Sequence, residues 1–196
     1  MIIYKHLNDN IKYDGSQINP LWAFKSFKIK GSSVVTWIGA MDIKSENLKD
    51  YEDVGLDIKS DSMVHCIVEH FDIQPGNLRI GYLRQRLLVM ILAEKLTKKG
   101  ILSLREGDDI YINNGKLTVS IAISSLNSTK IHLGINLTDI GSPNDVNVIG
   151  LLELKDENEN SYFTDDNLIE FIADFINSYI NELKTIELDI SKTDIS

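Results

Sequence analysis

The chain has 196 residues, and its 29 Asp and Glu against 20 Lys and Arg give a formal net charge of −9. This acidic balance disfavours a protein that binds the phosphate backbone of nucleic acids. No apolar run approaches the roughly 18 residues of a membrane helix, and the amino terminus lacks the pattern of a signal peptide, so we expect a cytoplasmic protein that does not enter a membrane. The length suits a single domain, predicted at residues 1–186, with a frayed tail at residues 187–196.

Alternation and periodicity predict these elements in chain order: a strand at 2–7, a helix at 19–27, strands at 33–38 and 64–71, a helix at 78–99, strands at 101–105, 110–112, 116–124, 131–138 and 148–154, and a helix at 165–183. The first helix begins with Asn19 as its cap and Pro20 in its first turn. The second ends at Gly100, and the third follows Thr164 as its cap. Because tight turns join consecutive strands, we expect an α+β class, with a largely antiparallel mixed sheet flanked by helices.

The most informative stretch runs from residue 107 to residue 136. Asn114 and Gly115 form the strongest short signal for a two-residue turn, because both central positions of such a turn need a positive φ. Lys116 then begins a strand in which aliphatic residues alternate with small or polar ones, and residues 131–138 repeat the alternation. The pattern predicts a sheet face that is small and polar, with Lys116 at one end.

We expect these two strands to pair as an antiparallel hairpin, with Thr118 roughly opposite Asn136 and Ala122 opposite His132. A floor of small side chains leaves room above it for a ligand. The alternative is a solvated outer face of an antiparallel sheet, which alternates polar and apolar residues in the same way. The sequence leaves both interpretations open.

The same stretch resembles a known group of enzymes. Three motifs follow one another: Asp109-Ile110-Tyr111, Asn114-Gly115-Lys116 and Gly134-Ile135-Asn136. This order resembles the central segment of biotin protein ligases and lipoate ligases, which share the fold of class II aminoacyl-tRNA synthetases. Residues 14–22 and 65–69 give the chain a second similarity, to the archaeal domain-of-unknown-function family 366. That family implies the same fold and brings no activity with it.

The resemblance implies roles for individual residues. Lys116 would approach the carboxylate of an acyl substrate and the α-phosphate of a nucleotide, Asn136 would orient the substrate, and Asp109 would fix the hairpin or the lysine. The ligand-binding residues implied are Thr118, Ser120, Ala122, His132, Gly134 and Trp22. Sheet edges in this superfamily often pair, so the resemblance also points to a homodimer.

The segment that should hold the nucleotide departs from the ligases. Residues 39–62 are rich in acids and contain no arginine. Like charge raises the cost of bringing a polyphosphate close, but Mg²⁺ can take carboxylate and phosphate oxygens together. ATP and Mg²⁺ are therefore the cofactors expected of a ligase-like enzyme here, and Asp42 is the first candidate for a metal ligand.

Two functions remain open from the sequence. The first is an enzyme that activates or transfers a small carboxylic acid, with Lys116 near the carboxylate or the α-phosphate. The second is a non-catalytic module on the same fold that captures a carboxylate against Lys116. The absence of a basic loop favours the module, whereas the lysine and the asparagine favour the enzyme.

Overall fold

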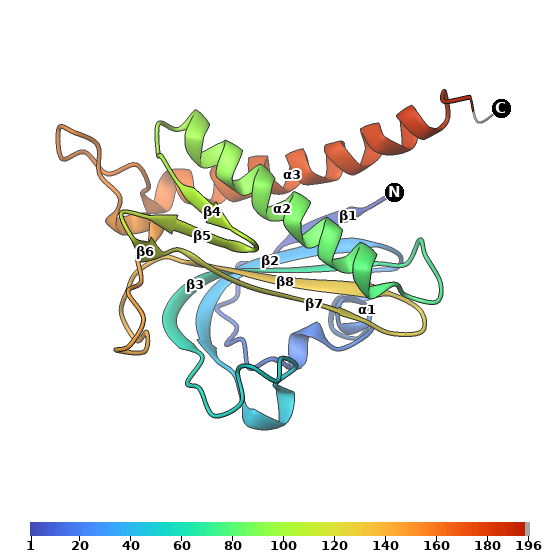
Figure 1. Cartoon of the computed structure of the whole chain (residues 1–196), viewed down its shortest axis with the longest axis horizontal. Coiled ribbons are helices and arrows are strands. Elements are labelled where there is room, and N and C mark those ends of the chain that lie inside the picture. The colour runs from blue at the N-terminus through green and yellow to red at the C-terminus, as the bar shows by residue number, and fades with distance from the viewer. Residues whose placement is uncertain (195–196) are drawn as a thin grey trace.

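The computed structural model describes residues 1–194 and consists of strands and helices in one body (Figure 1). The elements are β1 (Ile3–His6), η1 (Ser16–Ile18), α1 (Trp22–Phe27), β2 (Ser33–Asp42), η2 (Ser45–Asn47), β3 (Lys59–His70), α2 (Leu78–Lys98), β4 (Leu104–Glu106), β5 (Asp109–Ile112), β6 (Gly115–Lys116), β7 (Thr118–Ser124), β8 (Thr129–Asn136), η3 (Leu151–Glu153) and α3 (Asp165–Ile190). Among these residues, no helix is both long enough and apolar enough to cross a membrane.

The main sheet has five strands in the order β1-β2-β3-β8-β7. β1 runs parallel to β2, and the other neighbouring pairs are antiparallel. A second, three-stranded antiparallel sheet has the order β4-β5-β6. The predicted α+β class with a largely antiparallel mixed sheet is therefore confirmed.

Both faces of the main sheet are covered. Helices α2 and α3 lie on one face, and the amino-terminal segment with η1 and α1 lies on the other (Figure 1). On the first face, Leu88 of α2 and Phe175 of α3 belong to one apolar cluster with Val64 of β3. On the other face, Ile18 of η1 belongs to a second cluster with Trp37 of β2. Burying this much apolar surface on two sides is the main source of stability for the sheet. Every residue of β8 is buried as a result.

Several predicted boundaries were wrong. Asn19 does not cap α1, because it ends η1, and α1 begins after Leu21, whose φ of 66° lies in the left-handed region. The strand expected at residues 148–154 is replaced by a single bridge between Val148 and Lys116, followed by the short helix η3. Helix α3 continues through Ile190, so residues 187–190 are helical, while residues 195–196 of the expected tail lie outside the described residues.

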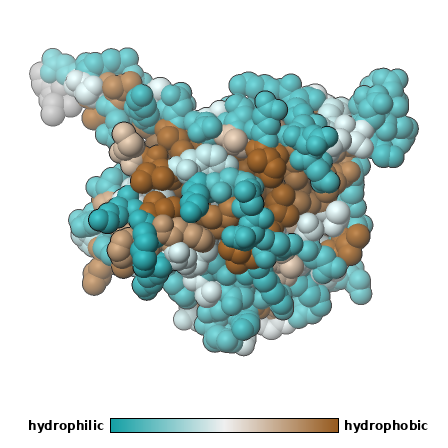
Figure 2. All heavy atoms as spheres, turned by 180° about the vertical axis from the view of Figure 1, so that it is seen from behind, coloured by the Kyte–Doolittle hydropathy of each residue, from teal (hydrophilic) through white to brown (hydrophobic). Residues whose placement is uncertain are grey.

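The outer surface is mostly polar. Seen from behind, apolar side chains gather in the middle of the face and polar side chains surround them (Figure 2). β1 and β7 are the edge strands of the main sheet, and Ile3 on β1 is 40% exposed. The homodimer implied by the resemblance stays a prediction.

A glycine controls how closely the segment before η3 approaches the end of β8. A Cβ on Gly150 would lie 2.2 Å from the carbonyl carbon of Leu137, which is backbone and cannot rotate away. We expect Gly150→Ala to lower the free energy of unfolding by about 1–3 kcal/mol or more. As a control, a Cβ on Gly81 in α2 would meet its nearest neighbour at 3.7 Å, and alanine favours helix, so Gly81→Ala should be neutral or stabilising. Urea unfolding of both variants checks this, and equal stabilities would contradict it.

Candidate functional site

A cavity of about 410 Å³ lies at one end of the main sheet. This volume is within the usual range of small-molecule sites. Its floor comes from the ends of β2, β7 and β8, and its walls come from residues 50–59, residues 108–109 and residues 142–148. Lys116 on β6 also lines it. Segments far apart in the sequence therefore meet at the cavity beside Lys116.

Lys116 is held from several directions. Its Nζ atom lies 2.8 Å from Oδ2 of Asp109, and each side chain is only about a quarter exposed, at 26% and 25%. Its backbone N–H donates to the carbonyl of Asn147 at 2.8 Å. Its own carbonyl accepts a hydrogen bond from the side-chain amide of Asn136 at 3.3 Å and one from the N–H of Ile149 at 3.2 Å. The structure thus brings together Lys116, Asp109 and Asn136, the three residues predicted to be catalytic.

The turn before Lys116 lies one residue earlier than the sequence indicated. Positive φ angles occur at Asn113 (50°) and Asn114 (64°), whereas Gly115 begins β6. Asparagine tolerates the left-handed region, so two of them can make this turn. Gly115 is needed for a different reason, because a Cβ there would lie 2.8 Å from Cβ of Ile149. The glycine lets the strand of Lys116 approach the wall of the cavity.

The predicted register between β7 and β8 was wrong by one residue. Thr118 lies opposite Ile135 and Ala122 opposite Ile131, while His132 lies opposite Ile121. A shift of one residue moves a strand's side chains to the other face of the sheet. The error arose because β8 is buried on both faces, so its alternation does not identify an outer side. The same burial rules out a solvated outer face at β8.

The predicted small, polar floor is consequently divided between two faces. Thr118, Ser120 and Ala122 face α2, where the Thr118 hydroxyl oxygen accepts a hydrogen bond from the Ile110 N–H at 2.9 Å. Ser120 accepts a hydrogen bond from the Gln85 side-chain amide at 2.9 Å. The remaining predicted ligand-binding residues on β8, His132 and Gly134, share the opposite face with Asn136. Trp22 packs against Trp37 and Phe27 and does not line the cavity.

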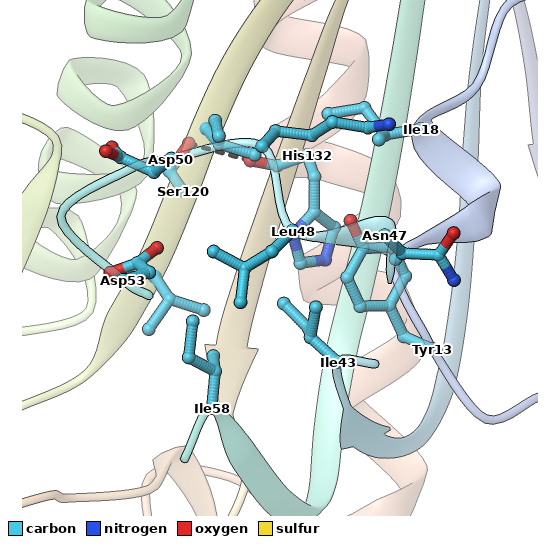
Figure 3. A pocket seen from close by; sticks show the side chains of 14 residues that line it. Tyr13, Ile18, Ile43, Asn47, Leu48, Asp50, Asp53, Ile58, Ser120 and His132 are labelled. Atoms are coloured by element: carbon cyan, nitrogen blue, oxygen red, sulfur yellow. Dashed lines mark hydrogen bonds between the residues drawn. The ribbon is translucent and has the colours of Figure 1, made fainter. Parts of the chain in front are cut away.

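A small apolar pocket of about 60 Å³ adjoins the cavity (Figure 3). Its apolar walls are Ile18, Ile43, Leu48, Ile58, Val119 and Ile121. Asp50, Asp53 and Ser120 line both spaces, so the apolar pocket and the space beside Lys116 adjoin. Figure 3 shows these two carboxylates on one side of the pocket and His132 with Tyr13 farther along it.

His132 lines the inner end of the pocket and pairs with His65 behind it, a contact that the sequence did not predict. Nε2 of His132 lies 3.1 Å from Nδ1 of His65, whose Nε2 lies 3.1 Å from the carbonyl oxygen of Gly39. The ring of Tyr13 stacks on His132 with centroids 3.8 Å apart. Burial lowers the pKa of His65 to about 4 and holds the pKa of His132 well below its usual value, so both rings are neutral at pH 7. No local pattern in the sequence links these two histidines. Only the pairing of β3 with β8 places them on neighbouring strands.

A family model described as "Domain of unknown function (DUF366)" matches residues 2–194. The chain belongs to this family. An uncharacterised protein of Methanocaldococcus jannaschii is 40% identical over 195 residues, which cover 95% of this chain and 82% of that protein. A solved protein of unknown function from Pyrococcus horikoshi is 35% identical, with a TM-score of 0.88 and full coverage of both chains. The predicted family is confirmed.

Solved ligases share the fold of this DUF366 chain at low identity. Biotin protein ligase from Aquifex aeolicus, solved with biotin and ATP, has a TM-score of 0.57 and 14% identity, over 93% of this chain and 72% of that one. A putative lipoate protein ligase from T. acidophilum, with bound lipoic acid, has a TM-score of 0.56 and 11% identity, over 92% and 85%. The ligase-like fold is therefore confirmed, and identities this low show the fold alone.

The charge around the DUF366 cavity is predominantly negative. The acids that line it are Asp50, Glu52, Asp53, Asp57, Asp108, Asp109 and Asp145, and its lysines are Lys59 and Lys116. Burial, together with repulsion from Asp50, raises the pKa of Asp53. Such a wall repels a bare phosphate chain and attracts cations.

The predicted metal ligand lies elsewhere. Asp42 forms a surface ion pair with Lys12, whose hydrogen bond and charge lower the pKa of Asp42. It does not line the cavity. Within residues 1–194, no three His, Cys, Asp or Glu side chains converge in the way a metal site needs.

Proposed function

We propose that this chain binds a small carboxylic acid, with the carboxylate at Lys116 and the apolar part in the adjoining pocket. The observation that carries the proposal is the position of Lys116, which lines a cavity that shares its wall with an apolar pocket. A lysine ammonium group forms strong charge-assisted hydrogen bonds with a carboxylate, and apolar walls provide the hydrophobic part of the binding energy. Proteins of the same fold that were solved with biotin or lipoic acid are consistent with such a ligand.

Asp109 and Asn136 support this role of Lys116. Asp109 is the carboxylate that Lys116 contacts at 2.8 Å, so an incoming carboxylate would share or replace that contact. Asn136 binds the carbonyl of Lys116 and thereby positions its strand relative to β8. Both are positioning residues in the proposal, and Lys116 is the group that contacts the ligand.

A nucleotide fits the lining residues less well than a carboxylate does. The walls of the cavity are acidic, and the segment expected to hold phosphates offers no arginine. Repulsion of a triphosphate would have to be overcome before any activation could occur. The geometry therefore favours capture of a carboxylic acid, and the proposal includes no nucleotide-dependent step.

Titration calorimetry with matched acids and amides tests the proposal. We expect hexanoate, octanoate and lipoate to bind, and hexanamide and octanamide to bind at least about tenfold more weakly, because a neutral amide loses the charge-assisted contact with Lys116. Equal affinity for acid and amide, or no binding of any acid, would refute the carboxylate site.

An activating enzyme on this fold remains the second candidate, because a ligase of the same fold was solved with biotin and ATP. It predicts acid-dependent exchange of pyrophosphate into ATP in the presence of Mg²⁺. Exchange above the level of a Lys116→Met variant would establish activation. Binding of the acid without exchange would leave a carboxylate-binding protein.

A further inference from the structure

The proposed function leaves one polar group of the apolar pocket unused, the Nδ1 atom of His132. This residue lines the pocket although only 2% of its surface is exposed. Its Nε2 atom pairs with His65, and no group among residues 1–194 forms a hydrogen bond with its Nδ1 atom. In the described chain, the fully enclosed side-chain polar atom that lacks a partner is the Ser60 hydroxyl oxygen and no other. Nδ1 of His132 is therefore not enclosed, and the space onto which it opens is the pocket.

The hydrogen bonds of the histidine pair fix which nitrogens carry protons. A backbone carbonyl only accepts, so Nε2 of His65, 3.1 Å from the carbonyl oxygen of Gly39, carries a proton. Because the His65 ring is neutral at pH 7, its Nδ1 has no proton and accepts a hydrogen bond from Nε2 of His132 at 3.1 Å. The neutral His132 ring then has its single proton on Nε2. This network assigns Nδ1 of His132 as an acceptor with a free lone pair.

The ring of His132 is held in place, so this acceptor is positioned before a ligand binds. Tyr13 stacks on it with ring centroids 3.8 Å apart and an angle of 10° between the ring planes (Figure 3). The backbone carbonyl of His132 accepts a hydrogen bond from the Ser120 hydroxyl at 2.7 Å, which joins β8 to β7 at this point. Most of the pocket surface is apolar, so a donor that enters it needs a specific acceptor.

The separation of Lys116 and His132 suits a single ligand. The apolar pocket and the cavity share Val119 and Ser120 of β7 as lining residues. Ile121, which lies opposite His132 in the sheet, follows Lys116 by five residues. A fully extended chain of that length spans at most about 18 Å. This is the scale of a medium-chain carboxylic acid.

We infer that the carboxylic acid bound here carries a hydrogen-bond donor at the end remote from its carboxylate, and that Nδ1 of His132 accepts this hydrogen bond. The inference rests on the proposed carboxylate site and adds a second recognition point to it. The largely apolar pocket favours a neutral donor, so the ligand class is a medium-chain acid with a distal hydroxyl or amide N–H group. A plain acid would cover the acceptor without a hydrogen bond, which costs binding energy.

Titration calorimetry with matched pairs tests this inference on the full chain. The probes are 6-hydroxyhexanoate against hexanoate, 8-hydroxyoctanoate against octanoate, and 10-hydroxydecanoate against decanoate. At one of these lengths we expect the hydroxy acid to bind about three- to tenfold more tightly than the plain acid, the range of a neutral hydrogen bond. The methoxy acid of that length has no donor and should bind no better than the plain acid.

Two variants make the test specific to His132. His132→Phe keeps an aromatic ring beside Tyr13 but has no acceptor, so the hydroxy acid should then bind more weakly than the plain acid, because its hydroxyl group would be buried without a partner. His70→Phe is the matched control and should keep the preference, because His70 is buried, bonds to Tyr179 at 2.9 Å and does not line the pocket. In the native protein, the nitrogen-15 resonance of Nδ1 of His132 should move upfield with the hydroxy acid and not with the plain acid.

Each outcome separates the two proposals. Equal binding within every pair would overturn the inference of a distal donor and leave the carboxylate site intact. No binding of any acid, with or without the hydroxyl group, would overturn both. A preference that survives in His132→Phe, or an Nδ1 resonance that does not respond to the hydroxy acid, would refute the role of His132.

Discussion

Replacing Lys116 with methionine is expected to weaken the binding of a small carboxylate by roughly ten- to a hundredfold, the range of a hydrogen bond to a charged group. Methionine has a similar length and keeps the apolar contacts of the lysine stem, so the loss reports the ammonium group. The variant also removes the ammonium group that lies 2.8 Å from Asp109. The unpaired carboxylate of Asp109 then repels the carboxylate of the ligand. Titration calorimetry with hexanoate on both proteins measures the change.

Two further variants make this test specific. Lys59→Met removes the other lysine of the cavity, which pairs with Asp57 and is 46% exposed, and it should change the dissociation constant by less than about threefold. Asp109→Asn frees Lys116 from its internal partner and should tighten binding. If Lys116→Met unfolds at the same urea concentration as the native protein and still binds hexanoate normally, the proposed contact does not exist.

Lowering the pH from 7 to 5 is expected to destabilise the fold by on the order of 2 kcal/mol for each fully buried histidine. His65, His70 and His132 are all buried, and burial is the largest cause that lowers the pKa of each one, to about 4 for His65 and His70. The unfolded chain takes up protons below pH ~6.5, whereas the folded chain does not. The stability that the neutral, buried histidines contribute is therefore complete above pH ~6.5 and is lost as the pH falls toward about 4.

Urea unfolding at pH 7, 6 and 5 measures this loss. His65→Gln can still form hydrogen bonds and should reduce the slope of stability against pH by about one proton. His6→Gln is the control, because His6 is only half-buried on β1 and contacts Thr36, and it should change the slope less. A slope that is unchanged in His65→Gln would mean that this histidine is already protonated in the fold.

Local patterns were sufficient to predict much of the fold. The helical spacing of apolar residues between positions 78 and 98 identified α2, and Lys98 and Gly100 marked its end. The alternation in residues 118–124 identified β7. Such features depend on neighbours a few residues apart, so the sequence contains them directly. The motifs around Lys116 also predicted that Asp109 and Asn136 would be near it.

Contacts between distant segments could not be predicted in the same way. The register of β7 and β8 was wrong because burial on both sides removes the distinction between an inner and an outer face. The start of α1 was wrong because Leu21 adopts a left-handed backbone, and its N–H donates to Glu69 at 3.0 Å, a partner 48 residues away. Tertiary contacts override a local capping preference when they satisfy the same backbone group.

The sequence by itself determined the α+β class and the family, and it singled out Lys116, on which the proposed site is centred. Only the tertiary structure decided what surrounds that lysine. The acidic residues 50–58, the wall of residues 142–148 and the histidine pair beneath the pocket all reach the site by long-range packing. Electrostatic and packing interactions depend on distance in space, and the chain folds these segments together only when both faces of the sheet are covered.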